Sequence, residues 1–305
     1  MASDLPAASS QPPTGWGLPQ VPDDWTVIDT QRAGPFVVGA HVRRADGRLV
    51  EWRARAHRKR LGLGLGRNAA TTPDRVRHRP TASCWWMAAL FAGGSVCFAL
   101  GSLPPFFNGL APSVVAATFF GGSVLFTSAS VIQYDESRAT PASIGPGAQR
   151  RPVIRRLLGV SPGSLGWWAA AIQLVGTLLF NLSTFAATQS SLDAQQDRRL
   201  IWAPDLFGSV CFLVASGLAF VEVNAGLMPR PDGSTGWRIA ALNMVGSIAF
   251  GVSAVAARYL PTSGQSANIA LVNASTFVGA LCFLGGSMLL PVEAAKGAPA
   301  MASAG

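Results

Sequence analysis

The amino-acid sequence predicts an all-α integral membrane protein with six transmembrane helices, arranged as three tandem helical hairpins behind a small cytoplasmic N-terminal region. Two observations lead to this fold class. The 305 residues are 49% hydrophobic and 13% charged, with a mean hydropathy of +0.32, whereas soluble domains are about 25% charged. In addition, variants of one short motif, Gly-Ser-x-x-Phe, recur in six separate apolar stretches.

The six apolar stretches are each long enough to cross a bilayer, which takes about 20 residues. They cover about 82–103, 113–134, 163–187, 205–226, 236–260 and 267–291. The basic residues near the spans fall mostly on one side: twelve (Arg67, Arg75, Arg77, Arg79, Arg138, Arg150, Arg151, Arg155, Arg156, Arg230, Arg238, Lys296) against three (Arg198, Arg199, Arg258). The positive-inside rule therefore predicts a multi-pass protein of the cell membrane with both termini in the cytoplasm.

The part of the chain before the first span divides in two. Residues 1–33 are rich in Pro, Ser, Ala and Gln near their start and are interpreted as a disordered tail. Residues 34–81 form a basic cytoplasmic segment, in which Asp46-Gly47 between apolar dipeptides predicts a small β-hairpin with a two-residue turn. At the other end, residues 294–305 are interpreted as a second disordered tail.

A basic run, Arg-Ala-Arg-Ala-His-Arg-Lys-Arg, occupies residues 53–60. Close to a membrane span, such a run favours contact with anionic lipid headgroups, each basic residue adding about 1 kcal/mol. A solvated linker that only sets topology is an equally weighted alternative, and a protein partner is another. No aromatic-basic interleaving is present, so we expect no nucleic-acid partner.

The motif recurs with constant spacing in three hairpins, at 82–137, 163–223 and 236–293. In the odd-numbered helices a Trp precedes the motif glycine by nine residues, and in the even-numbered helices a Glu follows it by fourteen. The motif residues are Gly94, Ser95, Phe98, Gly122, Ser123, Phe126, Gly176, Thr177, Phe180, Gly208, Ser209, Phe212, Gly246, Ser247, Phe250, Gly279 and Phe283. This regularity predicts a triplication with a pseudo-threefold axis along the membrane normal.

Helical geometry assigns directions to the motif. At 100° per residue, Gly and Phe four positions apart share one face, near mid-membrane depth, while the Trp points to the opposite side. We interpret the Gly-Phe face as a helix-packing surface rather than a ligand site, and the tryptophans Trp85, Trp167 and Trp237 as lipid-facing anchors at headgroup level.

At this motif the sequence resembles the YrhK-like family of bacterial membrane proteins, which are built as two-helix hairpins. The matching residues run from Trp85 to Glu136, Trp167 to Glu222 and Trp237 to Glu293. The resemblance implies three such hairpins in tandem and brings no known activity with it.

Glu136, Glu222 and Glu293 are the sharpest candidates for chemistry, because a carboxylate at a helix C-terminus meets the negative end of the helix dipole. Under the predicted symmetry they lie at one level and either form an acidic ring that attracts cations, or pair with arginines such as Arg156 or Arg238. The second interpretation is favoured, since interfacial carboxylates cost little.

The spans hold no acidic or basic residue at mid-depth, only amides such as Gln173, Asn181, Asn243 and Asn273, which join helices or line a path for a neutral solute. No nucleophile, metal or phosphate-binding pattern is present, so we expect no catalytic residues, no metal and no cofactor. The leading hypothesis is a non-enzymatic, closely packed membrane protein whose basic cytoplasmic face contacts lipid or a protein partner. The alternative is a channel or transporter for a cation or small solute, with the three glutamates at its cytoplasmic mouth.

Overall fold

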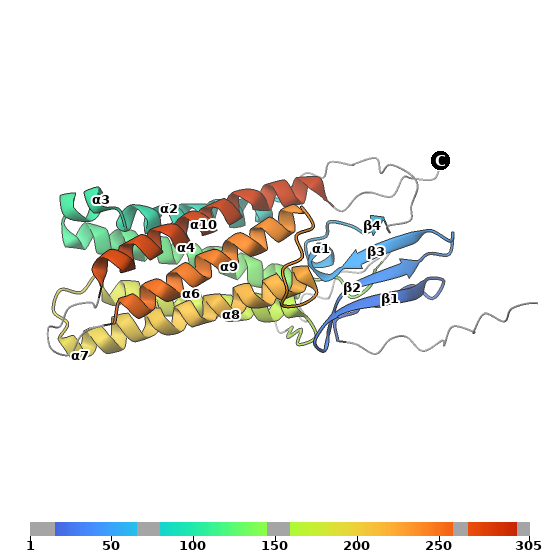
Figure 1. Cartoon of the computed structure of the whole chain (residues 1–305), viewed down its shortest axis with the longest axis horizontal. Helices are drawn as coiled ribbons and strands as arrows, with labels where there is room; N and C mark the ends of the chain where they lie inside the picture. Colours follow the sequence, from blue (N-terminus) through green and yellow to red (C-terminus); the bar gives the residue numbers. More distant parts are fainter. Residues whose placement is uncertain (1–15, 66–79, 145–158, 259–267, 298–305) are drawn as a thin grey trace, which may run out of the picture.

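The structure is a computed structural model and describes residues 16–65, 80–144, 159–258 and 268–297. A small β-sheet lies at one end of a long helical bundle (Figure 1). The strands are β1 Thr26–Ala33, β2 Phe36–Arg43, β3 Leu49–Arg53 and β4 Gly64–Leu65. The helices are α1 Ala54–Arg58, α2 Ala82–Gly101, α3 Pro104–Gly109, α4 Pro112–Arg138, α6 Leu165–Ala186, α7 Ala194–Gln196, η1 Asp197–Trp202, α8 Ala203–Asn224, α9 Thr235–Ala256 and α10 Ile269–Lys296.

The six predicted membrane-length helices are confirmed: α2, α4, α6, α8, α9 and α10 are all long and apolar enough to cross a bilayer. The helices α2, α6 and α9 each begin at a side-chain cap. Thr81, Ser164 and Ser234, respectively, accept a hydrogen bond from the backbone N–H of the residue three positions later. The fourth span is longer than the expected 205–226, since α7 and the π-helical η1 lead directly into α8 and start the helix at Ala194.

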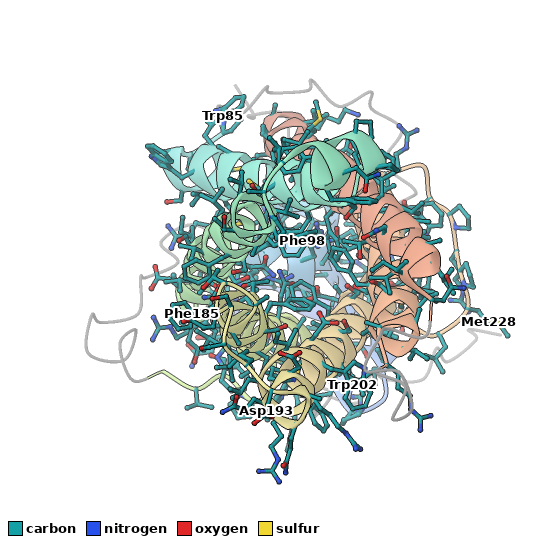
Figure 2. All side chains as sticks on the ribbon, turned by 90° about the vertical axis from the view of Figure 1, so that its left-hand side faces the viewer. Trp85, Phe98, Phe185, Asp193, Trp202 and Met228 are labelled. Carbon is teal, nitrogen blue, oxygen red and sulfur yellow. The ribbon has the colours of Figure 1, made fainter. Side chains whose placement is uncertain are left out.

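The six long helices form a closed ring in chain order. Each packs against the next, and α10 closes the ring against α2. The view down the bundle in Figure 2 shows Phe98 directed into the ring and Trp85 on its outside. The bundle therefore has a central axis enclosed by all six helices.

The β-sheet has the antiparallel order β1-β2-β3-β4. Its apolar face includes Val42, Val50 and Trp52, each at most 1% exposed. The interpretation of residues 1–33 as a disordered tail is wrong for 26–33, which form β1 because they pair antiparallel with β2 along the strand; residues 1–15 lie outside the described residues.

The predicted hairpin corresponds to β2 and β3, but its turn differs from the expected two-residue type. Arg44 and Arg48 close a wider turn by backbone hydrogen bonding. Gly47 has a φ of +79° while Asp46 does not enter the positive-φ region, and the Asp46 carboxylate accepts from the backbone of Arg48 instead. The Asp46 side chain thus stabilises this turn by a hydrogen bond, whereas a two-residue turn would have depended on the backbone conformation of Asp46.

The sheet and α1, together called the N-terminal domain (residues 16–65), contact one end of the bundle. Leu165 packs in one apolar cluster with Ala33 and Val38 of the sheet. Arg53 forms an ion pair of 3.0 Å with Asp232, in the connection between α8 and α9. The bundle end that meets the N-terminal domain is also the end at which α4, α8 and α10 finish.

The last helix continues past the predicted boundary at 293. α10 ends at Lys296, whose Nζ donates to Thr235 Oγ1 at 3.2 Å. The prediction of a disordered tail over 294–305 is therefore wrong for 294–296, because a contact with α9 holds this last turn; residues 298–305 lie outside the described residues.

Candidate functional site

Six phenylalanines, one from the motif of each long helix, meet on the bundle axis. Phe98, Phe180 and Phe250 form one triangle, with ring centroids 5.8–6.4 Å apart. Phe126, Phe212 and Phe283 form a second, with centroids 5.7–6.3 Å apart. The two triangles contact each other through three pairs at 5.1–5.6 Å, so this phenylalanine layer fills the middle of the bundle.

The motif glycines lie where helices of one hairpin approach most closely. A Cβ atom built at Gly94 would lie 2.9 Å from the Gly122 carbonyl oxygen, and one at Gly176 would lie 3.1 Å from that of Gly208. The third pair behaves alike: a Cβ at Gly279 would lie 3.0 Å from the carbonyl oxygen of Gly246. The absence of a side chain is what permits these backbone contacts.

The motif hydroxyls Ser95, Ser123, Thr177, Ser209 and Ser247 are each at most 1% exposed. Several of them join helices: Ser123 bonds Thr184 at 2.8 Å, and Ser247 bonds Ser216 at 2.7 Å. The expected position of the tryptophans is wrong for Trp167, which is 7% exposed because it packs against Tyr134 and Trp168. Trp85, at 57% exposure, does lie on the outside.

A cavity of about 80 Å³, called the chamber, lies between the phenylalanine layer and the N-terminal domain. Phe283 of the layer lines one end, and Arg55, Arg58 and Lys59 line the other. The side chains between them include polar ones from five helices: Gln133, Glu136, Gln173, Ser216, Asn243 and Ser287. Such a volume has room for a few water molecules.

The predicted amides take different positions. Gln173 and Asn243 line the chamber, and Gln173 accepts a long hydrogen bond of 3.4 Å from Gln133. Asn181 instead joins α6 to α4 by donating to Thr127 at 2.9 Å, and Asn273 is half-buried on α10. The chamber therefore combines carboxylate, amide and hydroxyl groups within a bundle of apolar helices.

Two of the three candidate glutamates are buried and paired with α1. Arg58 binds Glu222 through two hydrogen bonds, Nη1–Oε1 at 2.7 Å and Nη2–Oε2 at 2.8 Å. Arg55 binds Glu293 in the same way, at 2.7 and 3.0 Å, and Lys59 approaches the Glu293 carboxylate to 3.3 Å. The Glu222 side chain is 1% exposed and that of Glu293 is 9% exposed, so these pairs are removed from water.

The electrostatics of α1 follow from these pairs. Burial disfavours the charged forms of Arg55 and Arg58, but the attraction and hydrogen bonds of Glu293 and Glu222 outweigh it, so the pKa of each guanidinium is raised. Both arginines are therefore fixed cations at the end of the bundle. Burial also lowers the pKa of His57, which bonds the Pro141 carbonyl at 3.1 Å.

Glu136 is placed differently from the other two glutamates. It lines the chamber, its charge contributes to raising the pKa of Arg58, and it forms no ion pair within the described residues. The predicted ring thus contains two carboxylates bound by α1 and one that faces the chamber.

The structure corrects two expectations about charge partners. Glu222 and Glu293 pair with α1 rather than with Arg238, which is exposed; Arg156 lies outside the described residues. The expectation that residues 53–60 face lipid headgroups is wrong for Arg55, Arg58 and Lys59, whose side chains are 11–15% exposed and directed at the bundle. The physical reason is that buried carboxylates need cationic partners, and the N-terminal domain delivers them.

The role of α1 is the part of the site that sequence reasoning missed. A weak signal was available in the glycines that directly precede two motif tryptophans. A Cβ at Gly166 would overlap the Arg58 guanidinium, and one at Gly236 would lie 2.7 Å from Glu293 Oε1. Glycine at these positions makes room for the buried ion pairs.

Comparisons with known proteins add no identification: no protein-family model, no curated protein and no solved structure matches the chain. The resemblance to the YrhK-like family stays a prediction.

Proposed function

We propose that this multi-pass membrane protein is a non-enzymatic, gated passage for a cation or small polar solute, with the bundle axis as its path. The observation that carries the proposal is the chamber, in which Gln173, Asn243 and Glu136 face a shared cavity inside a ring of membrane-length helices. Polar and ionisable side chains inside a membrane bundle are costly; they pair with one another or face a water-filled cavity, and such groups commonly mark a path for a solute or ion.

The hypothesis of a purely structural, closely packed bundle explains fewer features than the passage does. The phenylalanine layer and the close glycine contacts already hold the helices together, as the packing hypothesis requires. That hypothesis gives no reason for a polar cavity next to the layer, where larger apolar side chains would fill the space and stabilise the bundle. The chamber therefore favours the passage over the purely structural role.

Under this proposal, the observed arrangement is a closed state of the passage. The phenylalanine layer, with Phe212 only 1% exposed, blocks the axis at one end of the chamber, and the cations of α1 occupy the other. Two closures around a central cavity are the arrangement expected of a path that opens to one side at a time.

The pseudo-threefold arrangement and the orientation belong to the same proposal. The two phenylalanine triangles and the three alike glycine pairs support an axis that relates the three hairpins. The excess of arginine on the side of the N-terminal domain supports placing that domain in the cytoplasm of a cell membrane.

The test is solute entry into proteoliposomes that contain the full chain, with rubidium ions, urea and glycerol as probes. We expect the protein to raise the permeability for at least one of them above that of protein-free vesicles. Asn243→Leu, which places an apolar side chain in the chamber, should abolish the increase. Val245→Leu is the matched control, because Val245 lies on the same helix and is 51% exposed on the outside.

Two results would contradict the passage. One is a permeability equal to that of protein-free vesicles for all three probes. The other is an increase that Asn243→Leu and Val245→Leu leave equally intact, since solute would then not cross the chamber.

A further inference from the structure

The short helix α1 is held to the bundle by charged side chains, while Ala54 and the His57 ring also contact the apolar cluster of the sheet. None of its five residues is buried as a whole, and its small side chains are alanines. Its strongest contacts are the pairs of Arg58 with Glu222 and of Arg55 with Glu293. Contacts of this kind hold a segment in one place without making it part of the hydrophobic core.

These side chains close the mouth of the chamber. Arg55, Arg58 and Lys59 contribute to its lining together with Glu136. Their three formal positive charges equal in number the three negative charges of Glu136, which shares the lining, and of Glu222 and Glu293, which pair with them. If α1 and the adjoining Lys59 withdraw, Glu136, Glu222 and Glu293 at this end of the bundle lose these three cations.

The rest of the N-terminal domain has attachments of its own. Arg53 pairs with Asp232, and Gln20 exchanges backbone hydrogen bonds with Ala142 and Ile144. The apolar cluster around Leu165 adds a third contact. These contacts do not involve α1, so they can hold the sheet in place when α1 moves.

The chain just after α1 contains two residues with a positive φ, and we interpret it as a hinge. Arg60 has a φ of +56° and Gly62 a φ of +86°. A left-handed conformation is uncommon for a residue with a side chain, and here the Arg60 guanidinium donates to the Ala139 carbonyl at 3.1 Å. Release of that bond would let the segment relax.

We propose that α1 is a tethered cationic plug that closes the chamber, and that its withdrawal opens the chamber to one side of the membrane with a preference for cations. The inference rests on the proposed passage, because it assigns the regulation of the same chamber. Withdrawal breaks the ion pairs of Arg55, Arg58 and Lys59 and the hydrogen bond of His57 to the Pro141 carbonyl, and no covalent step is involved.

The test measures access to the chamber directly. Ser287 lines it and donates its hydrogen bond to the Leu284 carbonyl of its own helix, so Ser287→Cys places a reporter thiol there with little disturbance. The background carries alanine at the four natural cysteines, Cys84, Cys97, Cys211 and Cys282. The full chain in lipid nanodiscs is then treated with a cationic or an anionic methanethiosulfonate reagent, and the rates of modification are compared.

Neutralising the plug should open the chamber. With Arg55→Gln, Arg58→Gln and Lys59→Gln combined, we expect the cationic reagent to react at least tenfold faster, and faster than the anionic one. Adding Glu136→Gln, Glu222→Gln and Glu293→Gln should remove the preference while the thiol stays accessible. The matched control, Arg43→Gln, Arg44→Gln and Arg48→Gln, removes the same charge from the β2–β3 turn and should leave the rate unchanged.

Three outcomes would overturn the plug. The first is an unchanged rate in the plug variant, and the second is an equal acceleration in the turn variant. The third is an acceleration that is the same for both reagents, as an unfolded bundle would give.

A measurement on the unaltered protein keeps the proposal testable if the plug variant does not fold. Hydrogen exchange should show the amides of 54–59 exchanging faster than those of β2, since α1 opens while the sheet stays in place. Exchange of α1 no faster than that of β2 contradicts the plug.

The two proposals fail separately. A thiol that becomes accessible in protein that moves no solute would leave the plug standing and remove the passage. Solute flux that is lost in Asn243→Leu but unchanged by neutralising Arg55, Arg58 and Lys59 would support the passage and contradict the plug.

Discussion

The Arg58 guanidinium and the Glu222 carboxylate form a two-point ion pair between residues 164 positions apart in the chain, with Nη1–Oε1 at 2.7 Å. It joins the N-terminal domain to the end of α8, and the Glu222 side chain is 1% exposed. This pair is the clearest evidence that α1 contacts the bundle rather than a lipid surface.

Removing one member of the pair should be strongly destabilising. Arg58→Ala leaves the Glu222 carboxylate buried without its partner, which costs about 3–5 kcal/mol in comparable pairs. We expect a marked fall in the thermal unfolding temperature of the detergent-solubilised protein. Arg238→Ala, at an exposed arginine, should stay within about 0.5 kcal/mol of the unaltered protein, and an equal effect of both substitutions would argue against the buried pair.

The glycine contacts can be tested within a single helix. A Cβ at Gly246 would lie 3.0 Å from Phe283 and 3.2 Å from the Cys282 Cβ, whereas one at Gly251 meets nothing within 4 Å. Gly246→Ala should lower the free energy of unfolding by about 1–3 kcal/mol through overpacking. Gly251→Ala should be neutral or stabilising by up to about 1 kcal/mol, because alanine favours the helix. Unfolding in a denaturing detergent series measures both, and the reverse order would refute the close contact.

The phenylalanine layer predicts an equally sharp contrast on α8. Phe212 is 1% exposed and touches rings from three other helices, while Phe207 is 61% exposed. Phe212→Ala should cost about 3–5 kcal/mol through the cavity it leaves, and Phe207→Ala should change stability little. Equal losses for the two, measured by the same unfolding series, would mean that the layer does not hold the bundle together.

The attachment of α1 should weaken in acid through His57. Burial lowers the pKa of His57 below its ordinary value of 6.5, so the docked segment binds fewer protons than the released one. The stability contributed by the neutral ring is complete above that ordinary pKa and declines as the pH falls below it. Burial is the main cause of the lowered pKa and the Arg58 charge adds to it, whereas the hydrogen bond to the Pro141 carbonyl opposes it; the Trp52 ring lies 5.9 Å away.

Hydrogen exchange over 54–60, corrected for intrinsic rates and followed from pH 7.5 to about 5.5, measures this effect. Protection should fall below pH 6.5 in the unaltered protein and stay level in His57→Gln, which retains an amide donor for the Pro141 carbonyl. The same pH dependence in both proteins would assign it to another group.

Local patterns explain which parts of the fold were predictable. The length of each apolar stretch predicts the six long helices, because a bilayer demands about 20 apolar residues per span. The hairpin around Gly47 was predictable because its turn is formed by residues that are neighbours in the sequence. β1 was missed because its exposed side chains resemble a polar tail; its partner β2 is what makes it a strand. Trp167 was misplaced because its burial depends on Tyr134, which comes from another helix.

By itself, the sequence determined the number of membrane-length helices and the positions of the motif glycines, phenylalanines and three glutamates along them. These positions follow from helical spacing, which is a matter of local geometry. Only the tertiary structure decided what those residues meet. It brought six phenylalanines into two triangles, enclosed a polar chamber beside them, and supplied Arg55 and Arg58 to the buried carboxylates of Glu293 and Glu222. The reason is that a buried charge takes whichever partner the folded chain places within hydrogen-bond distance, and separation along the chain carries no information about that distance.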